Sequence, residues 1–458
     1  MDFINSIVDT MNHYLWSYIL IVLLIGSGLY FTVKTNFVQF RHFKEMWRLL
    51  LTKNKKGSNG VSSFQAFCIS TASRVGTGNI AGVAMALSIG GPGAVFWMWL
   101  IALLGSSTSF IESTLAQIYK VNAEDGSFKG GPAYYMEKGL NKRWMGIAFA
   151  ILISISFGLI LSGVQSNTIS ESFNSVFGID KSIAGLIIAI LSLIIVLGGV
   201  KRIAKMLEII VPVFAGAYIL ITLFVVFKNI TLLPIILRDI FLSAFGIKEM
   251  ATGALVGAIM QGVKRGLFSN EAGMGSAPNA SATADVEHPV SQGLVQSAGV
   301  FVDTIIICSS TAFLVLISGS YTDKTLEGIQ ITQAALSSQV GSFGAIFISL
   351  SIFLFAFSSI IGNYCYGEMN LAFITKNKKI MFIYNILFAL MLMLGSVAKV
   401  SLVWNLADVF MGLMAILNII AIFMLRKDAF DALKDYDNQK KHNIKTPVYK
   451  KDIGVWGE

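Results

Sequence analysis

The sequence contains few charged residues. Aspartate, glutamate, lysine and arginine together make up 13% of its 458 residues, whereas hydrophobic residues make up 55% and the mean hydropathy is +0.70. This balance excludes a soluble globular protein, and no polar stretch is long enough to form a soluble domain. The formal net charge of +9 does not predict nucleic-acid binding, because the lysines and arginines gather in short connections between apolar runs. The sequence therefore predicts a polytopic protein that functions within a lipid bilayer.

Cysteine and histidine are also scarce. The three cysteines, Cys68, Cys308 and Cys365, all lie in apolar segments, so the sequence predicts neither a disulfide framework nor a metal-ligand cluster. The four histidines lie outside the expected membrane spans, and neither H-E-x-x-H nor G-x-S-x-G occurs. These absences argue against an intramembrane enzyme, and we expect no catalytic residues and no cofactor.

One polar stretch interrupts an apolar segment near the start of the chain. Residues 70–82 read S-T-A-S-R-V-G-T-G-N-I-A-G, and each of the glycines weakens a helix by roughly 1 kcal/mol relative to alanine. Arg74 is costly in hydrocarbon unless it is paired or faces water, and irregular backbone at membrane depth is tolerated only where protein or a watery cavity surrounds it. We therefore expect a broken helix whose freed carbonyls bind a cation and whose second half receives a carboxylate. The alternative is a glycine-rich face on which helices pack.

A second interruption lies far along the chain, in the segment 251–284. Residues 264–278 read K-R-G-L-F-S-N-E-A-G-M-G-S-A-P and place charges, glycines and a proline within a span-length stretch. The apolar runs predict about eleven spans, with the N-terminus outside and the C-terminus cytoplasmic, since the strongly basic connections fall on one side. After the first span, the broken helices begin two halves of five spans each. Because five is odd, the broken helices run in opposite directions, as in the inverted repeats of many secondary transporters.

These spans divide the chain into five parts. They are an N-terminal span with a cytoplasmic amphipathic helix, a first five-helix repeat, an external helix, a second five-helix repeat and a polar cytoplasmic tail, over residues 1–60, 61–228, 229–250, 251–426 and 427–458. The first apolar run lacks a preceding basic region and a small-residue cleavage site, so we expect it to remain as a span. The expected location is the plasma membrane, which is the inner membrane of a bacterial cell.

Four motifs resemble those of one transporter family. They are S-R-V-G-T-G-N-I-A-G, G-G-P-A-Y-Y-M-E-K-G-L, R-G-L-F-S-N-E-A-G-M-G-S-A-P and F-S-S-I-I-G-N-Y-C-Y-G-E, beginning at Ser73, Gly130, Arg265 and Phe357. Through them the chain resembles the alanine or glycine:cation symporter family, also called sodium:alanine symporters, over nearly its whole length. The resemblance implies an all-α polytopic membrane protein with the leucine-transporter-like 5+5 inverted repeat and one extra N-terminal helix. It also implies symport of a small neutral amino acid with sodium or, in some members, protons.

The resemblance also implies a sodium site between the first broken helix and the eighth helix of the ten-helix core. On this chain its ligands are the carbonyls of Ala72 and Val75 and the hydroxyls of Ser358 and Ser359. Such neutral oxygens are suitable ligands for a hard monovalent cation whose binding must remain reversible. The alternative for two adjacent serines is hydrogen bonding between helices.

The substrate is expected between the two breaks. Its carboxylate is placed near Thr77, Gly78 and Asn79, and its ammonium group near the carbonyls of Gly273, Met274 and Gly275 or the side-chain oxygen of Gln165. The family pattern often has an aromatic residue where this chain has Asn363. We therefore expect a more polar pocket that accepts a larger substrate, such as glutamine.

Several charges fall within the expected spans and are functional candidates for that reason. They are Arg74, Glu112, Lys264, Arg265, Glu271, Asp303 and Glu368. Arg74 and Glu271 are interpreted as gating or structural charges, with direct ligand contact as the alternative. The predicted function is sodium-coupled import of alanine or glycine, with glutamine as a further candidate. The alternatives are proton coupling and, less favoured because two inverted breaks suit alternating access, an ion channel.

Overall fold

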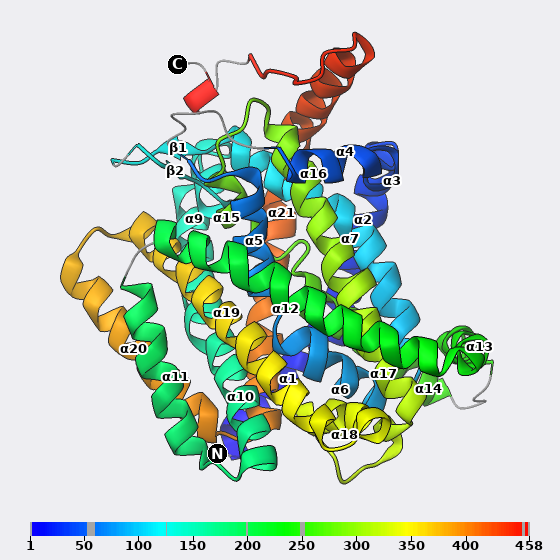
Figure 1. Cartoon of the computed structure of the whole chain (residues 1–458). Coiled ribbons are helices and arrows are strands. Elements are labelled where there is room, and N and C mark those ends of the chain that lie inside the picture. Colours follow the sequence, from blue (N-terminus) through cyan, green and yellow to red (C-terminus); the bar gives the residue numbers. More distant parts are fainter. Residues whose placement is uncertain are drawn as a thin grey trace.

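The structure, a computed structural model, describes residues 2–52, 60–124, 126–197, 200–247, 252–450 and 454–456, and nearly all of them are helical (Figure 1). Within these residues, eight helices are long and apolar enough to cross a membrane. They are Ser6–Lys34, Gly93–Ile118, Arg143–Phe177, Lys205–Lys228, Pro289–Ser318, Phe343–Ile374, Lys378–Val397 and Val400–Lys441. The expectation of a predominantly helical chain with many helices able to cross a membrane is confirmed.

The first broken helix lies where the sequence predicts it. It consists of α5 (Ser63–Arg74), η2 (Gly78–Gly82) and α6 (Val83–Gly90). α5 begins with a capping box, in which the side chains of Ser62 and Gln65 each accept a hydrogen bond from the other residue's N–H. The helix stops after Arg74, because Val75 adopts an extended conformation with φ −82° and ψ 90°.

The second broken helix consists of α14 (Thr252–Asn270) and α15 (Ala277–Ala282). Between them Glu271, Gly273 and Gly275 have φ values of +55°, +87° and +82°. Glycine adopts this left-handed backbone without steric cost, whereas a glutamate in it is uncommon. Pro278 lies at the start of α15, where its missing N–H costs nothing. The glycines and the proline that mark the motif therefore form the break.

The two broken helices run in opposite directions. The N–H of Val61, just before α5, donates to the carbonyl of Thr283, just after α15, at 3.1 Å. At the other end of the pair, Gly90 in α6 packs against Gly257 and Ala258 in α14. In Figure 1, α5 and α15 accordingly lie towards the end of the molecule that carries the C-terminus, and α6 and α14 towards the opposite end.

The remaining elements surround these two helices. Before and within the first half they are α1 (Asp2–Tyr14), η1 (Leu15–Leu20), α2 (Ile21–Lys34), α3 (Val38–Arg41), α4 (Phe43–Leu50), α7 (Gly93–Ile118), α8 (Pro132–Lys138), α9 (Arg143–Ile155), η3 (Ser156–Leu161), α10 (Ser162–Phe177), α11 (Lys181–Val196), α12 (Val200–Lys228), η4 (Ile230–Leu232) and α13 (Leu233–Ala244). In the second half they are α16 (Pro289–Val300), η5 (Phe301–Cys308), α17 (Ser309–Ser318), η6 (Ser320–Thr322), α18 (Ile329–Val340), α19 (Phe343–Ile374), α20 (Lys378–Val397), α21 (Val400–Lys441) and η7 (Gly454–Trp456). α13 lies at the periphery of the molecule (Figure 1).

Two elements were not expected from the sequence. A short antiparallel hairpin, β1 (Val121–Asn122) with β2 (Phe128–Lys129), lies in the loop before α8 and pairs Val121 with Lys129. α18 occupies a connection that the sequence left without structure. Its hydropathy is too low for a span, and it packs between α17 and α19 instead.

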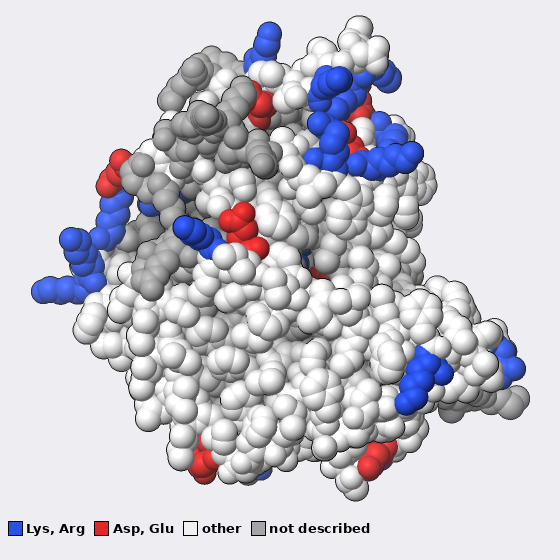
Figure 2. All heavy atoms as spheres, in the orientation of Figure 1, with Lys and Arg blue, Asp and Glu red and all other residues white. Residues whose placement is uncertain are grey.

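α21 continues to Lys441, far beyond residue 426, where the second repeat is expected to end. Its polar extension packs on the basic segment α3–α4, where Arg41 and His42 pair with Asp437 at 2.7 and 2.8 Å. Hydropathy marks where an apolar span stops but not where its helix stops, so the sequence did not predict that the tail would continue the last helix. Lysines and arginines gather on the surface over α3 and α4 (Figure 2).

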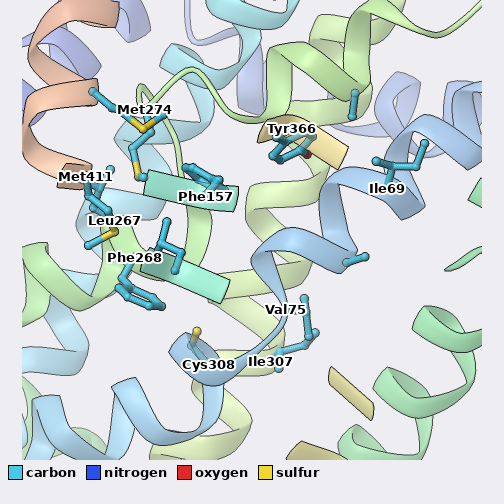
Figure 3. Packing of buried hydrophobic residues seen from close by; sticks show 14 of the residues in the cluster. Ile69, Val75, Phe157, Leu267, Phe268, Met274, Ile307, Cys308, Tyr366 and Met411 are labelled. Atoms are coloured by element: carbon cyan, nitrogen blue, oxygen red, sulfur yellow. The ribbon is translucent and has the colours of Figure 1, made fainter. Parts of the chain in front are cut away.

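The core lies around the two breaks. Figure 3 shows buried apolar side chains from both broken helices, among them Val75, Phe268 and Met274, in one packed region. The ring of Phe268 packs on that of Trp404 in α21, with 4.6 Å between the ring centroids. Apolar packing thus encloses the polar backbone of the breaks, as is required at membrane depth.

Candidate functional site

The first break lies directly against α19. The Ser359 hydroxyl is 2.7 Å from the carbonyl oxygen of Ala72, 3.3 Å from that of Val75 and 3.0 Å from that of Phe355 in its own helix. One hydroxyl hydrogen serves only one of these acceptors. Three of the four expected sodium ligands, Ala72, Val75 and Ser359, are therefore brought together, with more acceptors than donors.

The fourth expected ligand, Ser358, is buried but placed differently. Its hydroxyl donates to the carbonyl of Phe355 at 2.8 Å, within α19. Among the described residues it forms no hydrogen bond to the first broken helix. The hydroxyls of the neighbouring serines therefore differ in their contacts: that of Ser359 contacts the first break, whereas that of Ser358 contacts only α19.

Side chains cover the N-terminal end of the second half of the first broken helix. The N–H of Thr77 donates to the Gln165 side-chain oxygen at 2.9 Å, and the N–H of Gly76 donates to that of Asn79 at 3.0 Å. A Cβ on Gly76 would lie 2.7 Å from the same Gln165 oxygen, so only glycine fits there. The Thr77 hydroxyl is buried without a partner among the described residues. The structure thus brings Thr77, Asn79 and Gln165 together.

Gly78 allows a close approach between the two broken helices. A Cβ at this position would lie 2.6 Å from the ring of Phe268 in α14. The side-chain nitrogen of the adjacent Asn79 lies 2.8 Å from the hydroxyl of Ser269 and 2.7 Å from Oδ1 of Asp303. Asn79 therefore joins the first broken helix to α14 and η5.

Glu112 in α7 binds the backbone of the second break. Its two carboxylate oxygens accept hydrogen bonds from the N–H groups of Gly273 and Gly275, both at 3.2 Å. Asn418 in α21 donates to Glu112 at 2.8 Å and also reaches the Gly273 carbonyl at 2.9 Å. The Gly275 carbonyl accepts from Asn279 at 3.0 Å. Side chains of the protein thus already engage both of these glycine carbonyls, and Met274 between them is fully buried.

Ser73 connects the second break to α19. Its hydroxyl lies 3.0 Å from Oε1 of Glu271 and 2.7 Å from the side-chain oxygen of Asn363. Because a hydroxyl has one hydrogen, both contacts are satisfied if the Asn363 amide is turned so that its nitrogen donates to Ser73. Oε2 of Glu271 accepts from Ser276 at 2.5 Å. Glu271 therefore contacts hydroxyl groups, and Asn363 contacts the first broken helix.

The intramembrane cations divide into two kinds. Lys264 and Arg265 pair with the buried Asp408 at 2.7 and 3.0 Å. Arg74 is 2% exposed and, within the described residues, forms no ion pair. Its guanidinium lies 3.4 Å from the Gln296 carbonyl and 3.5 Å from the Ser109 hydroxyl, and its Nε is unpartnered. Arg74 is thus a buried charge with weak neutral contacts.

Sequence reasoning missed several residues of this region. Ser73, Ser269 and Asn418 are ordinary polar residues in apolar helices, and their importance comes only from the partners that the fold supplies. Asp408 carried a usable signal, since an aspartate lies inside the expected last span, but it was not singled out. All the residues predicted for the sodium and substrate sites, and both Arg74 and Glu271, are buried in the structure.

Comparisons with known proteins agree on one family. The profile of the Sodium:alanine symporter family matches residues 1–451. The probable sodium/glutamine symporter GlnT of Bacillus subtilis (strain 168) is 56% identical over 98% of this chain and 94% of its own. The amino-acid carrier protein AlsT of the same organism is 51% identical over 98% and 95%. The sodium/alanine symporter AgcS of Methanococcus maripaludis is 38% identical over 97% of this chain and 100% of its own. The chain therefore belongs to the sodium:alanine symporter family, a family of multi-pass membrane transporters.

Proposed function

We propose that this protein imports a small neutral amino acid together with sodium, by alternating access of a central site to the two sides of the membrane. Family membership supports sodium and an amino acid as the transported species. Alanine, glycine and glutamine are the candidate substrates. Glutamine is favoured by the name of the relative that is 56% identical, and alanine by that of the AgcS relative.

The observation that carries this proposal is the surplus of oxygens at the first break. The carbonyls of Ala72 and Val75 and the hydroxyl of Ser359 converge where α5 ends, and a single hydroxyl hydrogen cannot satisfy them all. A sodium ion between these neutral oxygens would bind reversibly, as a transported ion must. Ser358 is proposed as a further ligand that would have to release its bond to Phe355.

The proposed substrate site lies between the two breaks. The N–H groups of Gly76 and Thr77 point to side-chain oxygens of Asn79 and Gln165, and a substrate carboxylate offers the same kind of acceptor. The unpartnered hydroxyl of Thr77 supports this location. Gly78 forms the wall against α14, and the backbone from Gly273 through Met274 to Gly275 would face the ammonium group. Arg74 and Glu271 are proposed to brace this region.

The antiparallel arrangement of the two broken helices supports the proposed 5+5 inverted repeat. We assign eleven spans by adding α11 and the two broken helices to the eight long helices. The proposed repeats cover residues 61–228 and 251–426, with the N-terminus outside and the C-terminus cytoplasmic. The basic surface over α3 and α4 lies at the C-terminal end of the molecule, which agrees with a cytoplasmic position.

Sodium coupling allows the amino acid to be imported against its own concentration gradient. A neutral amino acid moving with one ion carries one charge, to which a potential of about 100 mV contributes roughly 2.3 kcal/mol. A tenfold sodium gradient adds about 1.4 kcal/mol, and together they support accumulation of roughly several hundredfold.

Proteoliposomes with an imposed sodium gradient test the proposal. Labelled alanine, glycine and glutamine are each supplied outside, and uptake is compared with and without sodium at equal pH on both sides. We expect uphill, electrogenic uptake of at least one of them only with sodium. Undiminished uphill uptake driven by a proton gradient in the absence of sodium would reassign the coupling ion. Downhill equilibration alone would indicate a channel.

A further inference from the structure

A surface cavity of about 330 Å³ lies between the turn that follows α2 and the polar extension of α21. This volume is within the range of small-molecule sites, roughly 300–1,000 Å³. Lys34 is the last residue of α2, and Arg426 and Lys427 follow the apolar part of α21. The cavity therefore lies just beyond the apolar parts of the first and the last membrane-spanning helix.

The lining of this cavity is strongly basic. Its cationic side chains are Lys34 of α2, Arg41 of α3, and Lys434 and Lys441 of α21. Asp437 is the acidic side chain among its described lining residues, so the lining has a formal net charge of +3. An anion is therefore the kind of ligand that this cavity favours.

The carboxylate of Asp437 does not neutralise the lysines, because both of its oxygens have other partners. Oδ2 accepts from Arg41 at 2.7 Å, and Oδ1 lies 2.8 Å from the ring nitrogen of His42. Within the described part of the chain, the three lysines of the cavity form no ion pair. The side-chain amides of Asn36 and Asn438 also line the cavity, and they form no hydrogen bond to described residues. Charged and neutral donors are thus both available to a ligand.

The insertion rules of membrane proteins do not account for this cavity. They require basic residues in the connections on one side of the membrane, wherever in those connections the residues fall. Here the salt bridge between Arg41 and Asp437 joins positions 396 residues apart in the chain. The fold therefore gathers cations from both ends of the sequence around one space.

The exposed face of α21 changes from apolar to basic along the helix. Positions 420, 424, 427, 431, 434, 438 and 441 follow one another at steps of three or four residues, and all are exposed. Ile420 and Met424 are the apolar end of this face, and Lys434 and Lys441 belong to the cavity. Asp431 lies on the same face but is not among the lining residues. An apolar surface therefore leads directly to a basic cavity.

We propose that this cavity binds the headgroup of an anionic phospholipid. The phosphate oxygens, which only accept hydrogen bonds, would lie among Arg41 and the three lysines, and an acyl chain would lie along Ile420 and Met424. The proposed topology places the cavity at the cytoplasmic leaflet, where anionic lipids attract basic segments next to membrane spans. A soluble phosphate would use the same cations but not the apolar face of α21. The inference does not depend on which solute or ion is transported.

Lipid binding is measured on the full chain, purified and delipidated in an uncharged detergent. Phosphatidylglycerol and phosphatidylcholine with identical acyl chains are titrated separately, and bound lipid is counted by native mass spectrometry. We expect one phosphatidylglycerol to bind at least tenfold more tightly than phosphatidylcholine. Equal affinities overturn the proposal. Glycerol phosphate, which has the anionic group without the chains, should not displace the lipid at a hundredfold excess; displacement would assign the cavity to a soluble anion and also overturn it.

A pair of double variants locates the lipid. Lys434→Gln with Lys441→Gln should weaken phosphatidylglycerol binding about tenfold. The control, Lys44→Gln with Lys445→Gln, removes the same charge from exposed lysines of α4 and the terminal segment that do not line the cavity, and should change the affinity less than twofold. Equal losses in the two double variants would show attraction to the general surface charge and overturn the site. Since all four lysines are exposed, neither double variant removes core packing, and the comparison of the two lipids on the wild type needs no variant.

Discussion

The Ser359 hydroxyl donates to the Ala72 carbonyl at 2.7 Å, although 287 residues separate the two in the chain. This contact joins α19 to the end of α5, and the carbonyl oxygen of Val75 lies 3.3 Å from the same hydroxyl. Ser358 follows the same helix but bonds to Phe355 instead. The two serines therefore form a matched pair for testing the proposed sodium site.

Ser359→Ala should raise the sodium concentration for half-maximal uptake about fivefold, because a ligand oxygen worth about 1 kcal/mol is lost. Ser358→Ala should change it less, since its hydroxyl meets only its own helix. The measurement is labelled-substrate uptake against sodium concentration, with substrate binding at saturating sodium as the control for folding. If neither variant changes the sodium dependence, the ion binds elsewhere.

Glu112→Gln should destabilise the protein. The two carboxylate oxygens accept hydrogen bonds from the N–H groups of Gly273 and Gly275, one each. A glutamine amide has only one oxygen in these positions, so one of the two N–H groups would lose its acceptor. An unpaired buried N–H costs about 1–3 kcal/mol. The apparent unfolding temperature in detergent should fall, whereas it should change little for Glu208→Gln, whose carboxylate bonds the half-buried Gln65. Similar unfolding temperatures for both variants would mean that Glu112 does not hold the break.

The positions of both breaks could be predicted, because glycine and charge within an apolar segment are informative without a partner. The contact of Ser359 with Ala72 and Val75 was expected only through the family resemblance, and the structure supports that part. The partners of the buried charges could not be predicted. Lys264 pairs with Asp408, and Arg74 lies against neutral groups of Gln296 and Ser109. These partners depend on how helices far apart in sequence pack, which the periodicity of the sequence does not reveal.

Polar helices outside the spans were also beyond prediction. The extension of α21 to Lys441 and the short α18 are recognised by what they pack against rather than by their hydropathy. The terminal segment illustrates this: the N–H of Tyr449 donates to the Glu287 carbonyl at 2.9 Å, and Trp456 donates to Gln117. Neither contact has a signal in the sequence.

Acid should weaken the contact between the terminal segment and α16 through His288. Burial lowers the pKa of His288 from 6.5 to about 4, although Asp435 acts to raise it. The ring is fully buried between Tyr436 and Tyr449, and its Nδ1 accepts the N–H of Val290. Because the folded state resists protonation of this ring, the contribution of His288 to the free energy of unfolding is fully present above about pH 6.5. It is lost as the pH falls towards 4, by an amount on the order of 3 kcal/mol.

The apparent unfolding temperature, measured from pH 7.5 to pH 4.5, checks this sign. His288→Gln should be less stable than the wild type at pH 7.5, because the ring packing is lost. The difference should shrink as the pH falls, since only the wild type has to protonate this position. A difference that stays constant across this range would show that His288 does not titrate with unfolding.

Asn363→Trp should depress glutamine uptake while sparing or improving alanine uptake. Asn363 lies one turn beyond Ser359 and therefore on the same side of α19, facing the first broken helix. A bulky aromatic residue there would cap the pocket and leave a space sized for alanine or glycine, whereas the shorter amide leaves room and both donor and acceptor groups for a glutamine side chain. A lost hydrogen bond in a dry pocket is worth roughly 1 kcal/mol, or about fivefold in affinity.

The contact between Asn363 and Ser73 supplies the control for this last prediction. If Asn363 serves only to bond α5, then Ser73→Ala and Asn363→Trp should impair every substrate to the same degree. If Asn363 recognises the substrate side chain, Ser73→Ala should leave the preference between glutamine and alanine unchanged while Asn363→Trp shifts it. Competition of labelled alanine uptake by glutamine, measured for the wild type and both variants, separates these outcomes. A wild-type protein that ignores glutamine would rule out the role of Asn363 in specificity.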